Sequence, residues 1–127
     1  MPITWREASD GRAAIITYTD PYTYAEWERE MSALIASTSF QRERRMLVDA
    51  RFCAPVSNEF VRQIMAYGAQ QIAELTGTRA ALLVNDVAQY GMARMAEIIA
   101  ETRNLPMTMR AFRDEADAER WLRAVDQ

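Results

Sequence analysis

Carboxylates follow two of the apolar segments that are typical of buried strands. Asp49 ends residues 46–49, and Asp86 comes shortly after residues 80–84. Because the carboxyl ends of parallel strands meet at one edge of a sheet, where open α/β sheets bind ligands, these two carboxylates define the first candidate site. With Tyr90 they have the residue types needed to divide acid and base roles in a shared cleft. Turn formation and helix capping also explain the two carboxylates, and we favour those structural roles.

Ser57 and Cys53 are the candidate nucleophiles of the chain. The sequence contains no histidine and no lysine, so the base beside either nucleophile would have to be a carboxylate. Neither residue lies in a recognised elbow such as Gly-x-Ser-x-Gly. We therefore predict that the protein is not an enzyme, with Ser57 acting as a helix N-cap and Cys53 as a small core or loop residue.

The composition also excludes the common cofactor sites. Cys53 is the only cysteine and histidine is absent, so an intramolecular disulfide and a Cys/His zinc site are both excluded. The four glycines are scattered along the chain and cannot form a loop that cradles phosphate. We expect no cofactor and no metal.

Length and charge are those of one ordinary globular domain, residues 1–127, with half of its residues apolar. The formal net charge is -3, and the basic run Arg42, Arg44, Arg45 is interrupted by Glu43, so nucleic-acid binding is not expected. The chain has neither the start of a signal peptide nor an apolar run approaching the roughly 20 residues that span a bilayer. We expect a cytoplasmic protein with no membrane span.

The period of the apolar residues alternates between strand and helix. Residues 3–5 and 14–18 predict a hairpin with an Asp-Gly turn, and residues 46–49, 80–84 and 107–112 predict three further strands. Helices are predicted from Tyr22 to the polar stretch 37–45, from Ser57 to Gly77, over residues 86–103, and from Asp114 with Ala118, Trp121, Leu122 and Val125 buried. The order β-β-α-β-α-β-α-β-α predicts a single α/β domain with a mostly parallel sheet and an antiparallel N-terminal hairpin.

The helix predicted over residues 86–103 has an unusually broad apolar face. Its apolar residues spread over well over half of the circumference and include Tyr90, Gly91, Met92 and Met95. Glycine inside a helix costs about 1 kcal/mol relative to alanine, which close packing of another helix, or of a ligand, would explain at Gly91. Packing of a helix is the favoured explanation. A face this broad indicates a second contact, so these four residues are the candidate partner or ligand surface.

Three motifs carry a resemblance that covers nearly the whole chain. They are the strand end Leu47-Val-Asp-Ala-Arg51, the helix Tyr90-Gly-Met-Ala-Arg-Met95, and the closing pattern from Phe112-Arg-Asp-Glu-Ala to Trp121-Leu122. With the element order, they resemble the SpoIIAA-like family of STAS-type domains. The resemblance implies helices packed mainly on one side of the sheet, in a shape related to anti-sigma-factor antagonists and to CRAL-TRIO lipid-binding domains.

The resemblance also gives Ser57 a second interpretation. In the antagonist branch, a serine at the start of the corresponding helix is phosphorylated, and the phosphate decides whether an anti-sigma kinase can dock. Ser57 lies near that place and is the candidate phosphoacceptor. This chain, however, reads Cys53-Ala-Pro-Val-Ser-Asn-Glu59 where the antagonists have a sequence similar to Asp-Ser-Ser-Gly. A helix N-terminus stabilises an anion by roughly 0.3 to 2 kcal/mol. The simple N-cap is the favoured explanation.

Two hypotheses of different classes follow. The first is a non-enzymatic STAS-type regulatory module that docks a protein partner or a second copy of itself, giving a homodimer, through the helices predicted after Ser57 and Asp86. The second is a carrier whose pocket, bordered by Tyr90, Met92 and Met95, holds a small apolar ligand such as a lipid acyl chain. An enzyme built on Asp49, Asp86 and Tyr90 is the third and weakest hypothesis.

Overall fold

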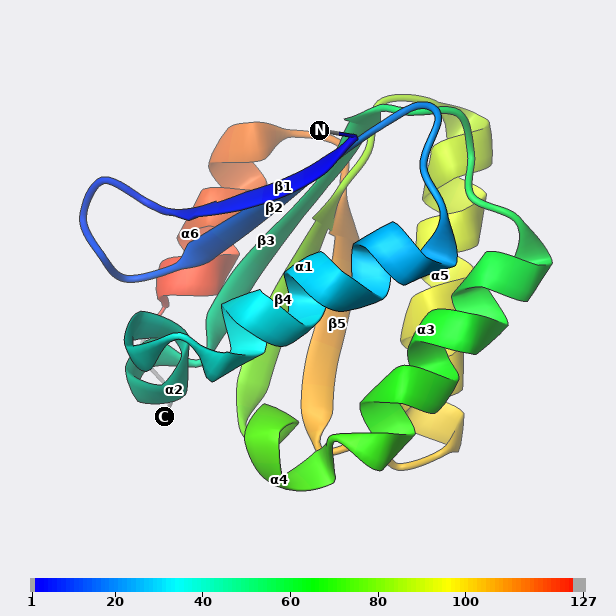
Figure 1. Cartoon of the computed structure of the whole chain (residues 1–127). Helices are drawn as coiled ribbons and strands as arrows, with labels where there is room; N and C mark the ends of the chain where they lie inside the picture. Colours follow the sequence, from blue (N-terminus) through cyan, green and yellow to red (C-terminus); the bar gives the residue numbers. More distant parts are fainter. Residues whose placement is uncertain (1, 125–127) are drawn as a thin grey trace.

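Five strands and six helices alternate along residues 2–124, the part of the chain that the computed structural model describes (Figure 1). In chain order they are β1 (Ile3–Glu7), β2 (Ala14–Thr19), α1 (Tyr24–Ala36), α2 (Thr38–Glu43), β3 (Arg45–Phe52), α3 (Asn58–Gln70), α4 (Ile72–Leu75), β4 (Thr78–Leu83), α5 (Val87–Thr102), β5 (Met107–Phe112) and α6 (Glu115–Arg123). Val125, expected on the buried face of the last helix, lies outside the described residues.

The strands form one sheet in the order β1-β2-β3-β4-β5. The first two strands pair antiparallel, and every later pair is parallel, so that Ile16, Val48 and Leu82 lie side by side across the sheet. Helical segments separate the parallel strands, as such crossovers require. The predicted α/β fold, with its N-terminal antiparallel hairpin, is confirmed.

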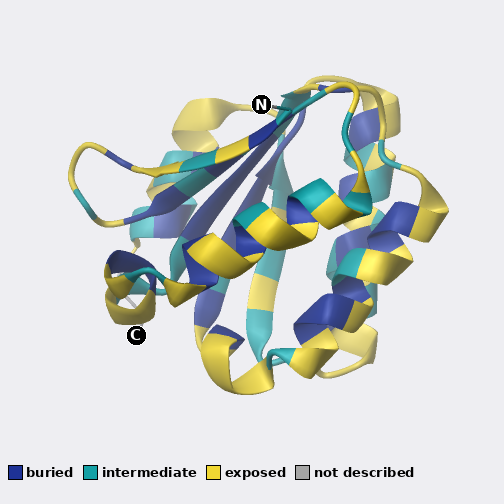
Figure 2. Ribbon diagram, in the orientation of Figure 1, coloured by how far each residue is buried: buried dark blue, intermediate teal, exposed yellow. Residues whose placement is uncertain are grey.

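The central strands are buried on both faces, because each contains a run of consecutive apolar residues, 46–48 in β3 and 80–83 in β4 (Figure 2). Val48 and Leu82 point to the side covered by α1, α3 and α5, where they join the larger core cluster. Leu47 and Leu83 point to the opposite side, where they pack with Leu122 of α6. Figure 1 shows α6 alone on that second side of the sheet. The expectation that the helices pack mainly on one face is therefore confirmed.

Two local elements differ from the prediction. The polar stretch 37–45 contains α2, which Ser37 caps by accepting a hydrogen bond from the Phe40 amide at 3.3 Å, and which buries the Phe40 ring. A single helix from Ser57 to Gly77 is wrong, because the chain breaks at Gln71, whose amide bonds the carbonyl three residues back. The break lets the short α4 turn Leu75 into the core.

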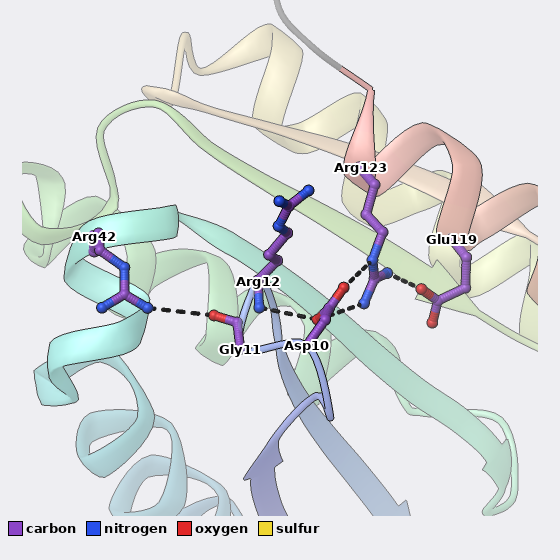
Figure 3. A network of polar contacts seen from close by, with 6 residues as sticks. All are labelled: Asp10, Gly11, Arg12, Arg42, Glu119 and Arg123. Atoms are coloured by element: carbon purple, nitrogen blue, oxygen red, sulfur yellow. Dashed lines mark hydrogen bonds and ion pairs between the residues drawn. The ribbon is translucent and has the colours of Figure 1, made fainter.

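The tip of the β1–β2 hairpin is held between two helices (Figure 3). Arg123 of α6 binds both carboxylate oxygens of Asp10, at 2.9 and 3.2 Å, and also pairs with Glu119 on its own helix. On the other side, Arg42 of α2 donates to the Gly11 carbonyl at 3.5 Å. These contacts join the end of the described chain to its first turn.

Candidate functional site

Helix α5 begins with a capping box. The Asp86 carboxylate accepts from the Gln89 amide at 2.8 Å, and the Gln89 side chain accepts from the Asp86 amide at 3.3 Å. Small residues, Ala93, Ala96 and Ala100, occupy the buried side of the helix. Because these side chains are short, the helix lies close to the sheet and presents its larger residues elsewhere.

The outer face of α5 carries a stripe of four residues, Val87, Gly91, Met95 and Ile98, at the spacing of one helix face. Val87 is 75% exposed and Ile98 is 53% exposed, Gly91 is exposed and Met95 is half-buried. We call these four residues the α5 stripe. Exposed apolar side chains that gather on one helix face make this stripe a candidate contact surface.

A groove of about 470 Å³ runs along the stripe. It is lined by Arg62 of α3 and by Gly91, Arg94, Met95, Ile98, Ile99 and Arg103 of α5 and its end. Two of the four residues predicted as a partner surface, Gly91 and Met95, therefore lie in one groove. Met92 turns inward to a cavity in the core, and Tyr90 packs half-buried against the core cluster. The structure does not bring the four together.

Nothing among the described residues requires a glycine at position 91. A Cβ atom built on it would meet no atom within 4 Å, and the residue has ordinary helical backbone rather than the positive φ of Gly11 and Gly77. The expectation that another helix of this chain packs closely against Gly91 is therefore wrong. The missing side chain instead leaves a hollow in the middle of the α5 stripe.

The rim of the groove is positively charged. Arg94 pairs with Glu97 at 2.7 Å, and the second carboxylate oxygen of Glu97 accepts from the Ala111 amide on the edge strand β5, also at 2.7 Å. Among residues 2–124, no carboxylate lies within ion-pair distance of the guanidinium groups of Arg62 and Arg103. The groove thus combines an apolar floor with free cationic groups.

Asp49 lies on the α6 side of the sheet, opposite α5, and is already bound by an arginine. Its two carboxylate oxygens bind the Arg51 guanidinium in a bidentate pair, each at 2.9 Å, and Arg51 also reaches Glu115 at the start of α6, at 3.2 Å. The hydrogen bond to Asp49 raises the pKa of Arg51. Asp49 lies on the α6 face with Leu47, because alternate strand residues share a face. Its role is to join β3 to α6.

Asp86 caps the helix on the other face of the sheet, so the two strand-end carboxylates have separate partners within the described residues. The residue that organises this edge is Gln89. Its buried side chain accepts from the Asn85 amide at 2.6 Å and donates to the Cys53 carbonyl at 2.6 Å. Our sequence analysis missed Gln89, although Asp86-x-x-Gln89 has the spacing of a capping box. A ligand site on Asp49 and Asp86 stays a prediction.

Both candidate nucleophiles occupy positions typical of residues with a structural role. Ser57 is the exposed N-cap of α3, and its hydroxyl oxygen accepts from the Phe60 amide at 3.0 Å. Phosphorylation of Ser57 stays a prediction. Cys53 is buried and donates weakly to the Ala50 carbonyl at 3.5 Å. Burial raises the pKa of the Cys53 thiol to about 11, so the thiol is protonated near neutral pH.

A cavity of about 100 Å³ lies inside the core, between the sheet and helices α1, α3 and α5. Its walls are almost entirely apolar and include Trp27, Phe60, Met65 and Met92. The Trp27 indole donates to the Tyr18 hydroxyl at 2.7 Å, so these two buried polar groups satisfy each other. Sites for drug-sized ligands measure roughly 300 to 1,000 Å³, several times this volume.

Residues 2–124 contain no cluster of three or more side chains that could hold a metal ion. No helix in that part of the chain has the length and apolar character needed to cross a membrane.

Comparison with known proteins identifies the fold. No protein-family model matches the chain, and no curated protein sequence matches it. A solved structure does: an uncharacterised protein of the DUF3478 family with a SpoIIAA-like fold, from Shewanella loihica. It superposes with a TM-score of 0.61 over 94% of this chain and 91% of that one, at 18% sequence identity. The fold is SpoIIAA-like. This similarity extends to the fold alone, and the SpoIIAA-like fold expected from the sequence motifs is confirmed.

Proposed function

We propose that this SpoIIAA-like domain is a non-enzymatic binding module that docks a protein partner through the α5 stripe. The observation that carries the proposal is the stripe itself, with Val87 and Ile98 exposed on either side of the hollow at Gly91. Apolar side chains cost free energy in water, at about 25 cal/mol per Å² of apolar surface, and a partner helix would remove them from it. A glycine that nothing in the described chain requires is explained by close approach of such a partner.

The candidate catalytic residues support a non-enzymatic role. Asp49 is held by Arg51, Asp86 caps α5, and the Cys53 thiol is buried with a raised pKa. Tyr90 lies on the helix that covers the other face of the sheet from Asp49. These groups are therefore assigned to folding rather than to chemistry on a substrate.

Photo-crosslinking tests the docking role without knowledge of the partner. A benzophenone amino acid replaces Val87, at the end of the α5 stripe, in the full chain, and the chain is irradiated in cells of the organism that makes it. Ile72 on α4 is the matched control, because it is also apolar and 52% exposed but lies outside the α5 stripe. We expect a covalent protein adduct from the Val87 variant and none from the Ile72 variant. Absence of an adduct at Val87, or equal adducts at both, contradicts the proposal.

Binding of a small apolar ligand is the second candidate function, and the core cavity is the observation that favours it. At about 100 Å³ the cavity is too small for an acyl chain unless α3 moves away from the sheet. Native mass spectrometry of gently purified protein decides between the two functions. We expect the mass of the polypeptide alone. A retained small molecule in stoichiometric amount would make carriage the better account.

A further inference from the structure

We infer that the α5 stripe docks a second copy of this chain, with the two α5 helices packed antiparallel about a twofold axis midway between Arg94 and Met95. This inference rests on the proposed docking function and names its partner. Three features of the described residues support it: the equal spacing of Gly91 and Ile98 from the axis, the match of a projecting side chain to a hollow, and the opposed dipoles of the two helices.

A twofold axis between Arg94 and Met95 exchanges positions 91 and 98 of the α5 stripe. Gly91 and Ile98 lie at equal distances on the two sides of the proposed axis, and Val87 and Thr102 lie at equal distances further out. In an antiparallel pair, Ile98 of each copy therefore stands over Gly91 of the other copy. A twofold contact requires this kind of self-complementary surface.

The two central residues also match in shape. Ile98 projects from the helix with 53% of its surface exposed, whereas Gly91 leaves open space where a side chain would stand. Helices pack by inserting the side chains of one into the gaps of the other, and a glycine at the crossing lets the two backbones approach closely. The same contact is made twice in the dimer, once on each side of the axis.

Opposed helix dipoles favour the antiparallel arrangement. Glu97 neutralises Arg94, which would otherwise meet its own copy near the axis.

The area of this contact sets the expected strength. Stable interfaces bury roughly 800 Å² on each partner, and one helix crossing buries less than that. We therefore expect a reversible dimer with a micromolar dissociation constant rather than a permanent one.

Sedimentation velocity across a concentration series measures the association. We expect the wild-type chain and the Ile72→Ser control to shift from monomer to dimer in the same concentration range, because Ile72 lies outside the groove. The Ile98→Ser variant should dimerise about tenfold more weakly or not at all. A wild-type chain that stays monomeric throughout, or equal dimerisation of the two variants, overturns the inference.

Disulfide trapping tests the register and keeps the inference testable if Ile98→Ser folds poorly. In a Cys53→Ala background, chains carrying Gly91→Cys are mixed with chains carrying Ile98→Cys and oxidised at a concentration where dimer forms. We expect a covalent dimer of one chain of each kind, with little bonding between identical chains. An Ile72→Cys chain is the control for random collision. Trapping of Gly91→Cys with itself would show a parallel contact and would overturn the inference.

The two experiments separate self-docking from docking in general. A Val87 crosslink to a different protein, combined with a monomer in sedimentation, overturns the second copy as partner and leaves the docking function in place. No crosslink at Val87 and no dimer overturn both.

Discussion

The side-chain amide of Gln89 donates a hydrogen bond to the main-chain carbonyl of Cys53 at 2.6 Å, which joins the start of α5 to the loop that follows β3. The other end of the same side chain accepts from the Asn85 and Asp86 amides. One buried side chain thus fixes how α5 leaves the sheet. The orientation of the α5 stripe depends on this connection.

We predict that Gln89→Leu lowers the free energy of unfolding by about 1 to 3 kcal/mol, because buried backbone groups lose their partners. Gln89→Glu should also destabilise, since a carboxylate can accept from the amides but cannot donate to the Cys53 carbonyl. Urea unfolding measures both. The control is Gln70→Leu at an exposed residue of α3, which should change the free energy by less than about 0.5 kcal/mol. Equal effects at Gln89 and Gln70 would contradict this role.

Gly91→Ala should raise the free energy of unfolding by up to about 1 kcal/mol, because alanine favours the helix and its Cβ meets nothing. Gly77→Ala is the opposite case. Gly77 has a φ of +80°, so alanine there should destabilise by roughly 1 to 2 kcal/mol. Thermal or urea unfolding of the two variants gives the signs. Destabilisation by Gly91→Ala would mean that the described chain does need this glycine.

Asp10 makes stability depend on pH in the acid range. The hydrogen bond from Arg123 lowers the pKa of Asp10 from 3.8 to about 2 in the folded chain. Its stabilising contribution is therefore fully present above pH 3.8 and is lost as the pH falls towards 2. We predict that wild type exceeds Asp10→Asn in stability above this window and that the difference shrinks within it. Urea unfolding at several pH values measures the difference.

Arg123→Gln provides the control for this prediction. Without the guanidinium, the pKa of Asp10 should return towards its ordinary value, so Asp10→Asn should have little further effect in that background. A difference between wild type and Asp10→Asn that is constant with pH would contradict the assignment.

Cys53 should react slowly with thiol reagents in the folded chain. The thiol is buried and its raised pKa, about 11, leaves little thiolate near neutral pH. Labelling with iodoacetamide, followed by mass spectrometry, should be much slower than in urea-unfolded chain. An exposed thiol introduced as Ile72→Cys in a Cys53→Ala background gives the reference rate. Labelling of native Cys53 at the reference rate would show that its environment is open.

The features of the fold that the sequence predicts well depend on residues that are neighbours in the chain. Leu47 and Val48 are consecutive and apolar, which predicts a strand buried on both faces, and the structure places them in different clusters. The break at Gln71 has no glycine or proline to mark it, because the gain comes from Leu75 reaching the core. Tertiary packing of this kind is not encoded in short-range spacing.

The candidate site could be predicted only in part, because spacing along the chain does not show which side chains pack inward. The broad apolar face of α5 indicates a second contact, but Met92 and Met95 are only three positions apart, and only the packed structure decides which of them turns inward. The hollow at Gly91 also becomes visible only in the packed structure. The sequence alone does not distinguish a glycine packed against a neighbour from a glycine in open space.

Methyl NMR of isoleucine-labelled protein tests most directly the claim that the α5 stripe is a docking surface for a second copy. Ile98 and Ile72 report from two sites of equal exposure, one in the groove and one outside it. As the protein concentration rises, we predict that the Ile98 methyl signal shifts progressively while the Ile72 signal stays constant. Constant signals from both residues, or equal shifts of both, would contradict the account.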